Sequence, residues 1–339
     1  MIHNIIKKRK ICFFPSVKIM FIVIFKLIII YLLIIFPTII FIIYKKKKNY
    51  VYLNKNIKMK IQKNTKVAVC TMGRSENLYA KEFVDYYLKL GINHIFIYDD
   101  NDPNTEKISD VIGHNYKDNI TIYENIKNTI KNQPSAFTDC YRKNKLKYDW
   151  FLMIDMDEFL YLREDNTINA YLSNNFDNCD FIKLNRAQSI DNDLIHYENK
   201  SLFERFKPPF LGDLFIKSLI RGNISGLKYG VHSPRISPLN NKSCLNNGQS
   251  IISVKNMNFD KAFLIHFRYK STEEFIAKYK RGYRNWFGSK LKNYLNHHIK
   301  LYFQQNKITL EKINYIEKEL KINLRLIKLN YYLSKILFL

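Results

Sequence analysis

The feature that most constrains the fold is an apolar run that ends in three acids. Residues Trp150 to Ile154 are apolar, and Asp155, Asp157 and Glu158 follow within four residues. Unpaired carboxylates are too costly to bury inside a strand. The run therefore predicts a buried strand whose carboxyl end carries the acids to the edge of a sheet, where they need a counter-charge.

Asp155 and Asp157 are separated by one residue, so their side chains point to the same side of an extended chain. Two carboxylates beneath a crevice suit a hard divalent cation that keeps coordination positions open for phosphate oxygens. Such pairs are also common in solvated loops, and it is the preceding apolar strand that makes this one specific. We expect a metal site here, with Asp157 exposed at the strand end.

Basic charge is concentrated at the two ends of the 339-residue chain. Residues 1–60 carry 13 Lys and Arg and no acid, and residues 261–339 carry 17 Lys and Arg with 5 acids. Residues 61–260, which hold the acidic motif, have 25 of each sign. A nucleic-acid-binding protein would carry basic charge on its reading surface, so nucleic acid is not expected as a partner. The distribution favours ends that lie against an anionic membrane.

Residues 19–44 are almost continuously apolar, interrupted by Lys26 and Pro37, and basic clusters flank them. Residues 27–44 alone are long enough to cross a bilayer core. A cleaved signal peptide would have a shorter apolar region and a small-residue cleavage site; a core helix of a soluble protein is the other alternative. We expect a single-pass transmembrane anchor, preceded by a basic tail (1–18) and followed by a polar stalk (45–65), with orientation and compartment left open.

Strands and helices alternate after the stalk. Strands are predicted at residues 66–71, 94–98, 119–123, 150–154, 180–184, 214–220 and 263–266, with helices at 76–90, 104–113, 134–146 and 271–284. This order predicts an α/β domain over residues 66–290, with a mainly parallel sheet flanked by helices. Residues 291–339 are expected to include basic amphipathic helices, either lying on a membrane surface or packed with a solvated basic face.

The five cysteines are Cys12, Cys70, Cys140, Cys179 and Cys244. None has the Cys-x-x-Cys spacing of a zinc cluster. Cys70 and Cys140 fall in predicted buried elements, so we expect them to be small core residues. The redox compartment stays open.

The order and spacing of several segments resemble the family 92 glycosyltransferases and related family 2-like enzymes. These segments are residues 71–77, 81–91, 97–102, 133–140 and 150–159, followed by His232 and the run His266-Phe267-Arg268-Tyr269-Lys270-Ser271. The similarity covers about residues 66–284. Asp100 and Phe267 depart from the family's usual Asn and Tyr at these places.

The resemblance implies a GT-A fold, which is a Rossmann-like mixed sheet, and a nucleotide-sugar donor, a UDP-linked hexose such as galactose. It also implies a saccharide acceptor, inversion at the anomeric carbon, and Mn²⁺ or Mg²⁺ held by Asp155 and Asp157. The chemistry agrees, because the nucleoside diphosphate leaving group gains negative charge that a Lewis acid stabilises.

Further site residues are expected around these aspartates. The candidates for nucleotide-sugar binding are Thr71, Arg74 and Glu76 after the first strand, Asp99 toward ribose or base, Asp139 and Arg142 toward the base, and Lys217 and His232 toward phosphate. His266, at the end of a predicted strand, is expected to be the third metal ligand, with His232 as its rival and a strand-capping role as the alternative.

Inversion needs a base that deprotonates the acceptor hydroxyl. The candidates are Glu158, which could instead brace the metal pair, and the loop acids Asp191, Asp193, Glu204 and Asp213. Two other functions stay open at this point: another metal-dependent phosphoryl or nucleotidyl transferase, and a membrane-anchored binding module whose catalytic site has decayed.

Overall fold

The computed structural model describes residues 50–53, 64–173, 176–230, 234–235, 242–251, 257–282 and 288–336. The predicted anchor at 19–44 and His232 lie outside these ranges. Within them, no helix combines the length and the apolar character needed to span a bilayer.

Ten strands form one sheet in the described ranges. They are β1 (Tyr50–Val51), β2 (Val67–Gly73), β3 (His94–Asp99), β4 (Ile120–Tyr123), β5 (Trp150–Met153), β6 (Glu158–Leu162), β7 (Phe181–Gln188), β8 (Phe210–Arg221), β11 (Ser243–Cys244) and β12 (Ala262–His266). A separate two-stranded ribbon pairs β9 (Lys228–Tyr229) with β10 (Pro234–Arg235).

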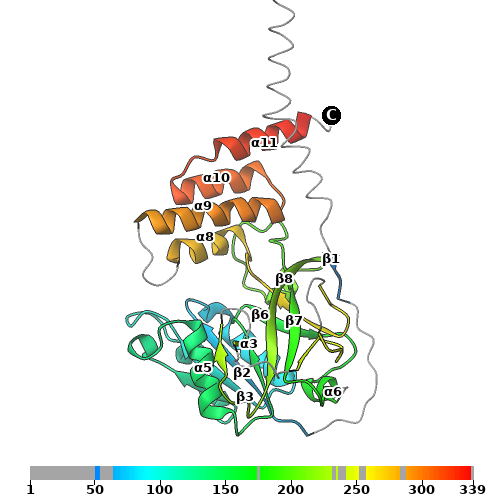
Figure 1. The fold of residues 1–339 in the computed structure, drawn as a ribbon. Coiled ribbons are helices and arrows are strands. Elements are labelled where there is room, and N and C mark those ends of the chain that lie inside the picture. The colour runs from blue at the N-terminus through cyan, green and yellow to red at the C-terminus, as the bar shows by residue number, and fades with distance from the viewer. Residues whose placement is uncertain are drawn as a thin grey trace, which may run out of the picture. The chain divides into compact units, whose positions relative to one another are not determined.

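The described residues form the α-helices α3 (Asn77–Lys89), α4 (Ile108–Ile112), α5 (Gln133–Asn144), α6 (Ile168–Leu172), α7 (Leu202–Arg205), α8 (Thr272–Arg281), α9 (Gly288–Gln305), α10 (Leu310–Leu320) and α11 (Arg325–Ile336). Figure 1 shows α8 to α11 stacked beside one another, apart from the helices that flank β2 and β3.

The main path of the sheet runs β4-β3-β2-β5-β8-β7-β12-β6. The first four strands are parallel to one another, and β8 enters antiparallel between β5 and β7. The predicted α/β fold with a mainly parallel sheet flanked by helices is therefore confirmed. The antiparallel entry of β8 was not predicted, whereas α9 falls within the C-terminal region where helices were expected.

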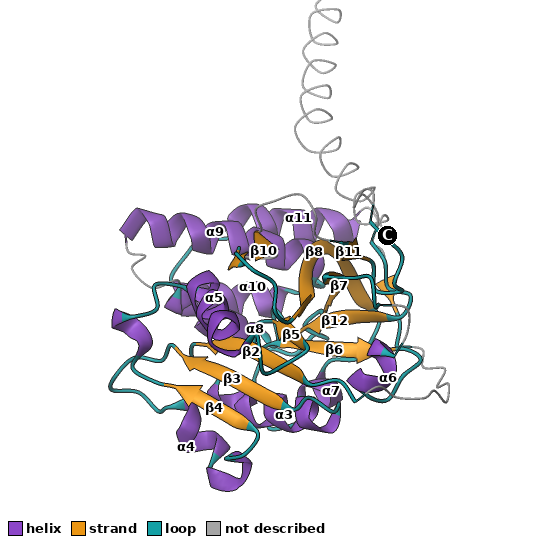
Figure 2. Cartoon of the chain, turned by 60° about the horizontal axis from the view of Figure 1, so that its bottom comes forward, coloured by secondary structure: helices purple, strands orange, loops and turns teal. Residues whose placement is uncertain are grey.

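Alternate residues of β2 explain how helices cover both faces of the parallel half. Val67 and Val69 point to the face that α3 covers, whereas Ala68 and Cys70 point to the face that α5 covers. Figure 2 shows α3 and α5 on opposite sides of β2 and β3. Because both faces are buried, the carboxyl ends of the parallel strands offer the free edge for a site.

The C-terminal helices have an apolar cluster of their own around Phe275, Tyr302 and Ile313. A buried lysine of α10, Lys312, forms an ion pair of 2.8 Å with Asp191 in the loop after β7. Helix α10 is thus packed within the domain, and it belongs to a compact unit spanning residues 49–331.

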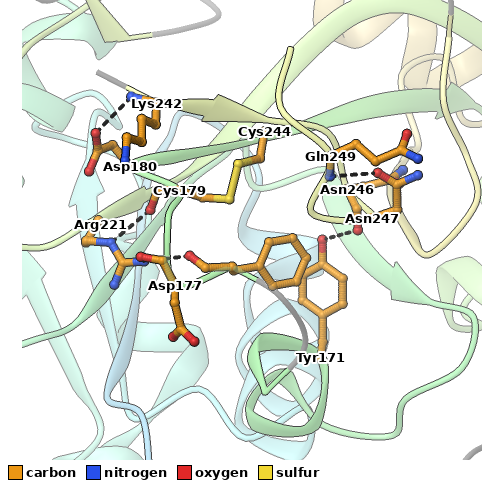
Figure 3. Close-up of a disulfide and its surroundings, with 11 residues drawn as sticks. Tyr171, Asp177, Cys179, Asp180, Arg221, Lys242, Cys244, Asn246, Asn247 and Gln249 are labelled. Atoms are coloured by element: carbon orange, nitrogen blue, oxygen red, sulfur yellow. Dashed lines mark hydrogen bonds between the residues drawn. A yellow bond between two sulfur atoms is a disulfide. The ribbon is translucent and has the colours of Figure 1, made fainter. Parts of the chain in front are cut away.

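Two disulfides join elements that are distant in sequence. Cys70 of β2 is bonded to Cys140 of α5, and Cys179, just before β7, is bonded to Cys244 of β11. Figure 3 shows the second bond, beside the hydrogen bond of 2.9 Å from the backbone N–H of Lys242 to Asp180. Cys70 and Cys140 are fully buried, as expected of core residues, but the bond between them was not predicted, because it depends on the packing of α5 on β2.

We predict that reduction destabilises the folded protein by about 2–4 kcal/mol per bond, since each disulfide restricts the unfolded chain. Chemical denaturation with and without reductant measures the loss. The control is the double variant Cys179→Ala/Cys244→Ala, which should be less stable without reductant and less sensitive to it. A midpoint that reductant leaves unchanged in the parent protein would contradict both bonds.

Candidate functional site

A cavity of about 700 Å³ opens at the carboxyl ends of β2 and β5. Its wall combines the parallel strands with the C-terminal helices α8 and α9. The lining residues are Met72, Arg74, Glu76, Asp100, Lys131, Asn132, Gln133, Pro134, Asp155, Met156, Asp157, Arg186, Phe215, Lys217, His266, Arg268, Lys278, Tyr279, Arg281, Gly282, Tyr294 and His298.

The acidic motif forms the floor of this cavity. β5 ends at Met153 and β6 begins at Glu158, so Asp155 and Asp157 lie in the turn between them and not in an extended strand. The expectation that Asp157 is exposed was wrong: only 3% of its surface is accessible. It is covered because side chains from β12 and α8 reach over the turn.

Three side chains could hold one metal ion. Ligand atoms of Asp155, Asp157 and His266 all lie within 4.8 Å of one another. Opposite ligands of an octahedral ion such as Mg²⁺ stand about 4.2 Å apart, so the group needs only a small contraction. Carboxylate oxygens suit Mg²⁺ and Mn²⁺, and imidazole is an accepted additional ligand.

The protonation state of His266 is the one that a metal ligand needs. Burial is the main cause that lowers its pKa to about 4, which leaves the imidazole neutral near pH 7, as metal binding requires. Its Nε2 atom is 3.5 Å from Asp157 Oδ1, and its Nδ1 atom is buried without a hydrogen-bond partner among the described residues. A buried nitrogen that lacks a partner is consistent with a bound group.

The three acids of the motif each have a cation beside them. Lys217 of β8 donates to Asp155 Oδ1 at 2.8 Å, and Lys278 of α8 donates to Asp157 Oδ2 at 2.6 Å. Glu158 lies 3.3 Å from Arg186 of β7. These are the counter-charges that the sequence required but did not identify.

The cations decide the charge state of the two aspartates. Burial alone would raise both pKa values, but Lys217 lowers the pKa of Asp155, and Lys278 with His266 lowers that of Asp157 well below its usual range. Both carboxylates are therefore ionised at neutral pH, as metal ligands must be.

The structure brings six predicted site residues to the cavity wall. They are Arg74, Glu76, Asp155, Asp157, Lys217 and His266. Glu76 is held by an ion pair of 2.8 Å with the buried Lys270. Segments that are more than 190 residues apart in the sequence thus meet at one site.

Other predicted site residues lie away from the cavity wall. Thr71 is fully buried within β2. Asp99 accepts backbone hydrogen bonds from Asn101 and Ile108, and the acid that lines the cavity is its neighbour Asp100. Asp139 accepts hydrogen bonds from Tyr98 and Arg142, and the side chain of Arg142 is 77% exposed.

The five candidate bases of the sequence differ in their surroundings. Asp193 pairs with Lys307 and Lys312, and Glu204 takes part in the N-terminal cap of α7. Glu158 is inaccessible to solvent, and burial raises its pKa to about 7. Asp191 is bound by Lys312 and Tyr302 in the C-terminal cluster. Asp213 accepts hydrogen bonds of 2.7 Å from Arg186 and Gln188, and Arg186 lines the cavity.

Sequence reasoning did not select Gln133, Arg186 and Lys278 as site residues. Gln133 donates to Asp155 at 2.5 Å from the first turn of α5. A signal for Lys278 was available, because the predicted helix that follows His266 had to turn one face toward the strand end. The pattern did not show which of its lysines lies on that face.

The family model "Glycosyltransferase family 92" matches residues 63–322. The chain is 29% identical over 109 residues to a glycosyltransferase family 92 protein of Oryza sativa subsp. japonica, covering 32% of this chain and 18% of that protein. A relative in Arabidopsis thaliana is 29% identical over 118 residues, covering 32% and 20%. The matched segments therefore span about a fifth of these relatives.

Among solved structures, mannosyl-3-phosphoglycerate synthase from Rubrobacter xylanophilus is similar with a TM-score of 0.26 and 16% identity, over 38% of this chain and 42% of that chain.

We predict that Mn²⁺ affinity changes less than about threefold between about pH 7.5 and about pH 5.5. An imidazole with an ordinary pKa near 6.5 would lose about tenfold in its neutral fraction over this range. His266, with its pKa lowered to about 4, stays neutral until the pH falls close to that value. Isothermal titration calorimetry at both pH values measures the affinity.

The matched variants are His266→Ala and His232→Ala. The first should weaken Mn²⁺ binding at both pH values, and the second should not. A tenfold loss in the parent protein at the lower pH would contradict the buried ligand. The reverse result for the two variants would mean that His232 is the ligand.

Proposed function

Because the chain belongs to glycosyltransferase family 92, we propose that it transfers a sugar from a nucleotide-sugar donor to a saccharide acceptor. The observation that carries the proposal is the buried group of Asp155, Asp157 and His266 at the carboxyl ends of a parallel sheet, where ligands of such sheets bind. The parallel half of the sheet with helices on both faces supports a GT-A fold.

The proposed cofactor is Mn²⁺ or Mg²⁺, which when bound supplies a Lewis acid that stabilises negative charge on the leaving diphosphate. Lys217 and Lys278 hold the two aspartates ionised and oriented before the donor arrives. Their ammonium groups lie beside the ligand atoms, so they also attract an incoming diphosphate. Arg74 and Glu76 are proposed to frame the nucleotide from the end of β2.

We propose inversion at the anomeric carbon, for which the acceptor hydroxyl must lose its proton to a base. Of the five candidates, Asp213 is favoured, because its carboxylate is held by Arg186 next to the cavity wall. Glu158 is better suited to brace the turn, since it accepts a hydrogen bond of 3.0 Å from the backbone N–H of Asp155. Asp191 is already engaged in a buried ion pair with Lys312 of α10.

The proposed donor is a UDP-linked hexose such as galactose, which follows from the family resemblance of the sequence. The two alternative functions have less support. No observation specifically favours nucleotidyl or phosphoryl transfer, and a complete Asp-Asp-His group with its counter-charges is not what a decayed site would retain.

We further propose that residues 19–44 anchor the protein in a membrane as a single pass. The two disulfides of the domain favour an oxidising compartment such as the secretory lumen, because cytosolic thiols are kept reduced. The protein would then be permanently attached to the membrane, with the catalytic domain on its lumenal side.

Asp157→Asn should lower donor turnover by about 100-fold or more, since a catalytic metal site would lose one of its charged ligands. The measurement is nucleotide release from UDP-hexoses with Mn²⁺, compared with release in excess chelator. Full turnover by the variant, or by the parent protein in chelator, would exclude the metal-dependent reaction.

The matched control for this substitution is Asp85→Asn, which makes the same chemical change in an exposed ion pair of α3. Because Asp157 is buried and bound to Lys278, its variant should also lose stability, by about 1–3 kcal/mol. Thermal melting measures this loss, so that a turnover defect can be separated from unfolding.

Deletion of residues 1–48 should yield a soluble protein that retains donor turnover, because residues 49–331 form a compact unit. Any residual binding to anionic vesicles should fall as salt is added, since charge–charge attraction is screened. Flotation with vesicles, compared with the full-length chain, measures it. Tight membrane binding of the truncated protein in high salt would contradict the proposed anchor.

A further inference from the structure

The charge of the cavity is unbalanced. Among the described residues, seven Lys and Arg side chains line it, against four Asp and Glu side chains. A divalent cation and the diphosphate of a nucleotide sugar carry roughly equal and opposite charges, so their binding together leaves this excess in place. Positive charge therefore remains for something other than the donor.

Part of the excess comes from Lys131, before α5, and the rest lies on the side formed by α8, α9 and the segment after β12. Near the motif, each cation is paired: Lys217 with Asp155, and Lys278 with Asp157. No carboxylate from the described side chains of α8 and α9 lines the cavity, but Arg268 and Arg281 do.

Arg268 forms its hydrogen bonds with uncharged groups. It donates to Gln188 Oε1 at 3.5 Å and to the Tyr279 hydroxyl at 3.4 Å, and its Nη2 atom is 3.2 Å from His298 Nδ1. The nearby carboxylate of Asp213 is occupied by Arg186 and Gln188, each at 2.7 Å. The guanidinium is thus held in place without an ion pair to any carboxylate in the described ranges.

Arg281 forms fewer interactions with its surroundings than Arg268 does. Its Nε atom is buried, and no hydrogen bond or ion pair joins it to the part of the chain that the structure describes. Arg281 follows Lys278 by three residues in α8, so the two share a helix face. The rise along that helix places Arg281 about 4.5 Å beyond Lys278, a displacement comparable with the width of one sugar ring.

Aromatic side chains complete this side of the cavity. Tyr279 stacks on His298 with ring centroids 4.4 Å apart, and Tyr294 meets the same imidazole edge to face at 4.4 Å. Apolar and aromatic walls with a few oriented polar groups are typical of small-molecule sites.

We propose that Arg268 and Arg281 form an acceptor subsite for an anionic group, a carboxylate or a phosphate, so that the acceptor is an acidic saccharide. The inference rests on the proposed function, and it specifies the class of acceptor. A guanidinium binds a carboxylate or a phosphate through paired N–H donors. These charge-assisted hydrogen bonds are stronger than those it forms with the neutral hydroxyl of a sugar.

The competing explanation is that these arginines hold the diphosphate of the donor. A binding experiment with that position filled separates the two. Full-length protein is saturated with Mn²⁺ and UDP, and binding of three probes is measured by saturation-transfer NMR: methyl glucoside, methyl glucuronide and methyl glucoside 6-phosphate. The two anionic probes distinguish a carboxylate from a phosphate subsite.

At least one anionic probe should bind about tenfold more tightly than the neutral glucoside, and Arg281→Gln should abolish this preference. Lys280→Gln is the matched control: it removes one positive charge from the same helix, at an exposed side chain 3.5 Å from Glu319. It should keep the preference. Thermal melting of each variant shows whether its fold is retained, and Arg268→Gln provides a second, independent substitution.

Equal binding of all three probes by the parent protein would overturn the subsite. So would a preference that persists in both arginine variants, or one that is present without UDP and disappears when UDP and Mn²⁺ are added. Turnover is a separate readout. A parent protein that shows the anion preference but releases no nucleotide from any nucleotide sugar would contradict the proposed function and leave the anion subsite in place.

Discussion

The interaction on which the site depends is the neutralisation of three acids in a single turn. Asp155, Asp157 and Glu158 lie too close together and too deep to remain charged alone, because desolvation and mutual repulsion would oppose folding. Lys217, Arg186 and Lys278 supply the opposite charges from β8, β7 and α8. The antiparallel half of the sheet and the C-terminal helices are therefore structural requirements of the motif.

This arrangement also gives the cavity two distinct sides. Toward the parallel strands, acids and bases are paired around a group that could hold a metal ion. Toward α8 and α9, neither Arg268 nor Arg281 forms an ion pair with any of the described residues, and aromatic rings accompany them. The diphosphate of a donor would bind on the first side, and the anionic group of an acceptor would bind on the second.

The disulfides fix α5 on β2 and β11 beside β7.

Much of the fold followed from local pattern. The alternation of apolar strands with helices indicated the mainly parallel sheet, and the acids after Ile154 indicated a site at its edge. His266 could be selected because it too ends an apolar strand. The exposure of Asp157 was misjudged, since its cover comes from Lys278, which is 121 residues away. The disulfides were missed for the same reason: 70 and 65 residues separate their cysteines.

The sequence by itself determined which segments are strands and helices, where the carboxylates stand at a strand end, and to which family the chain is similar. These properties depend on apolar periodicity and on short-range order, which can be read along the chain. Only the tertiary structure decided which cation faces which acid and that Cys70 meets Cys140. It also decided that Arg268 and Arg281 form no ion pair with an acid in the part of the chain that is described. Such pairings depend on the crossing of elements far apart in sequence, and many basic residues of the chain could have filled each place until packing selected one.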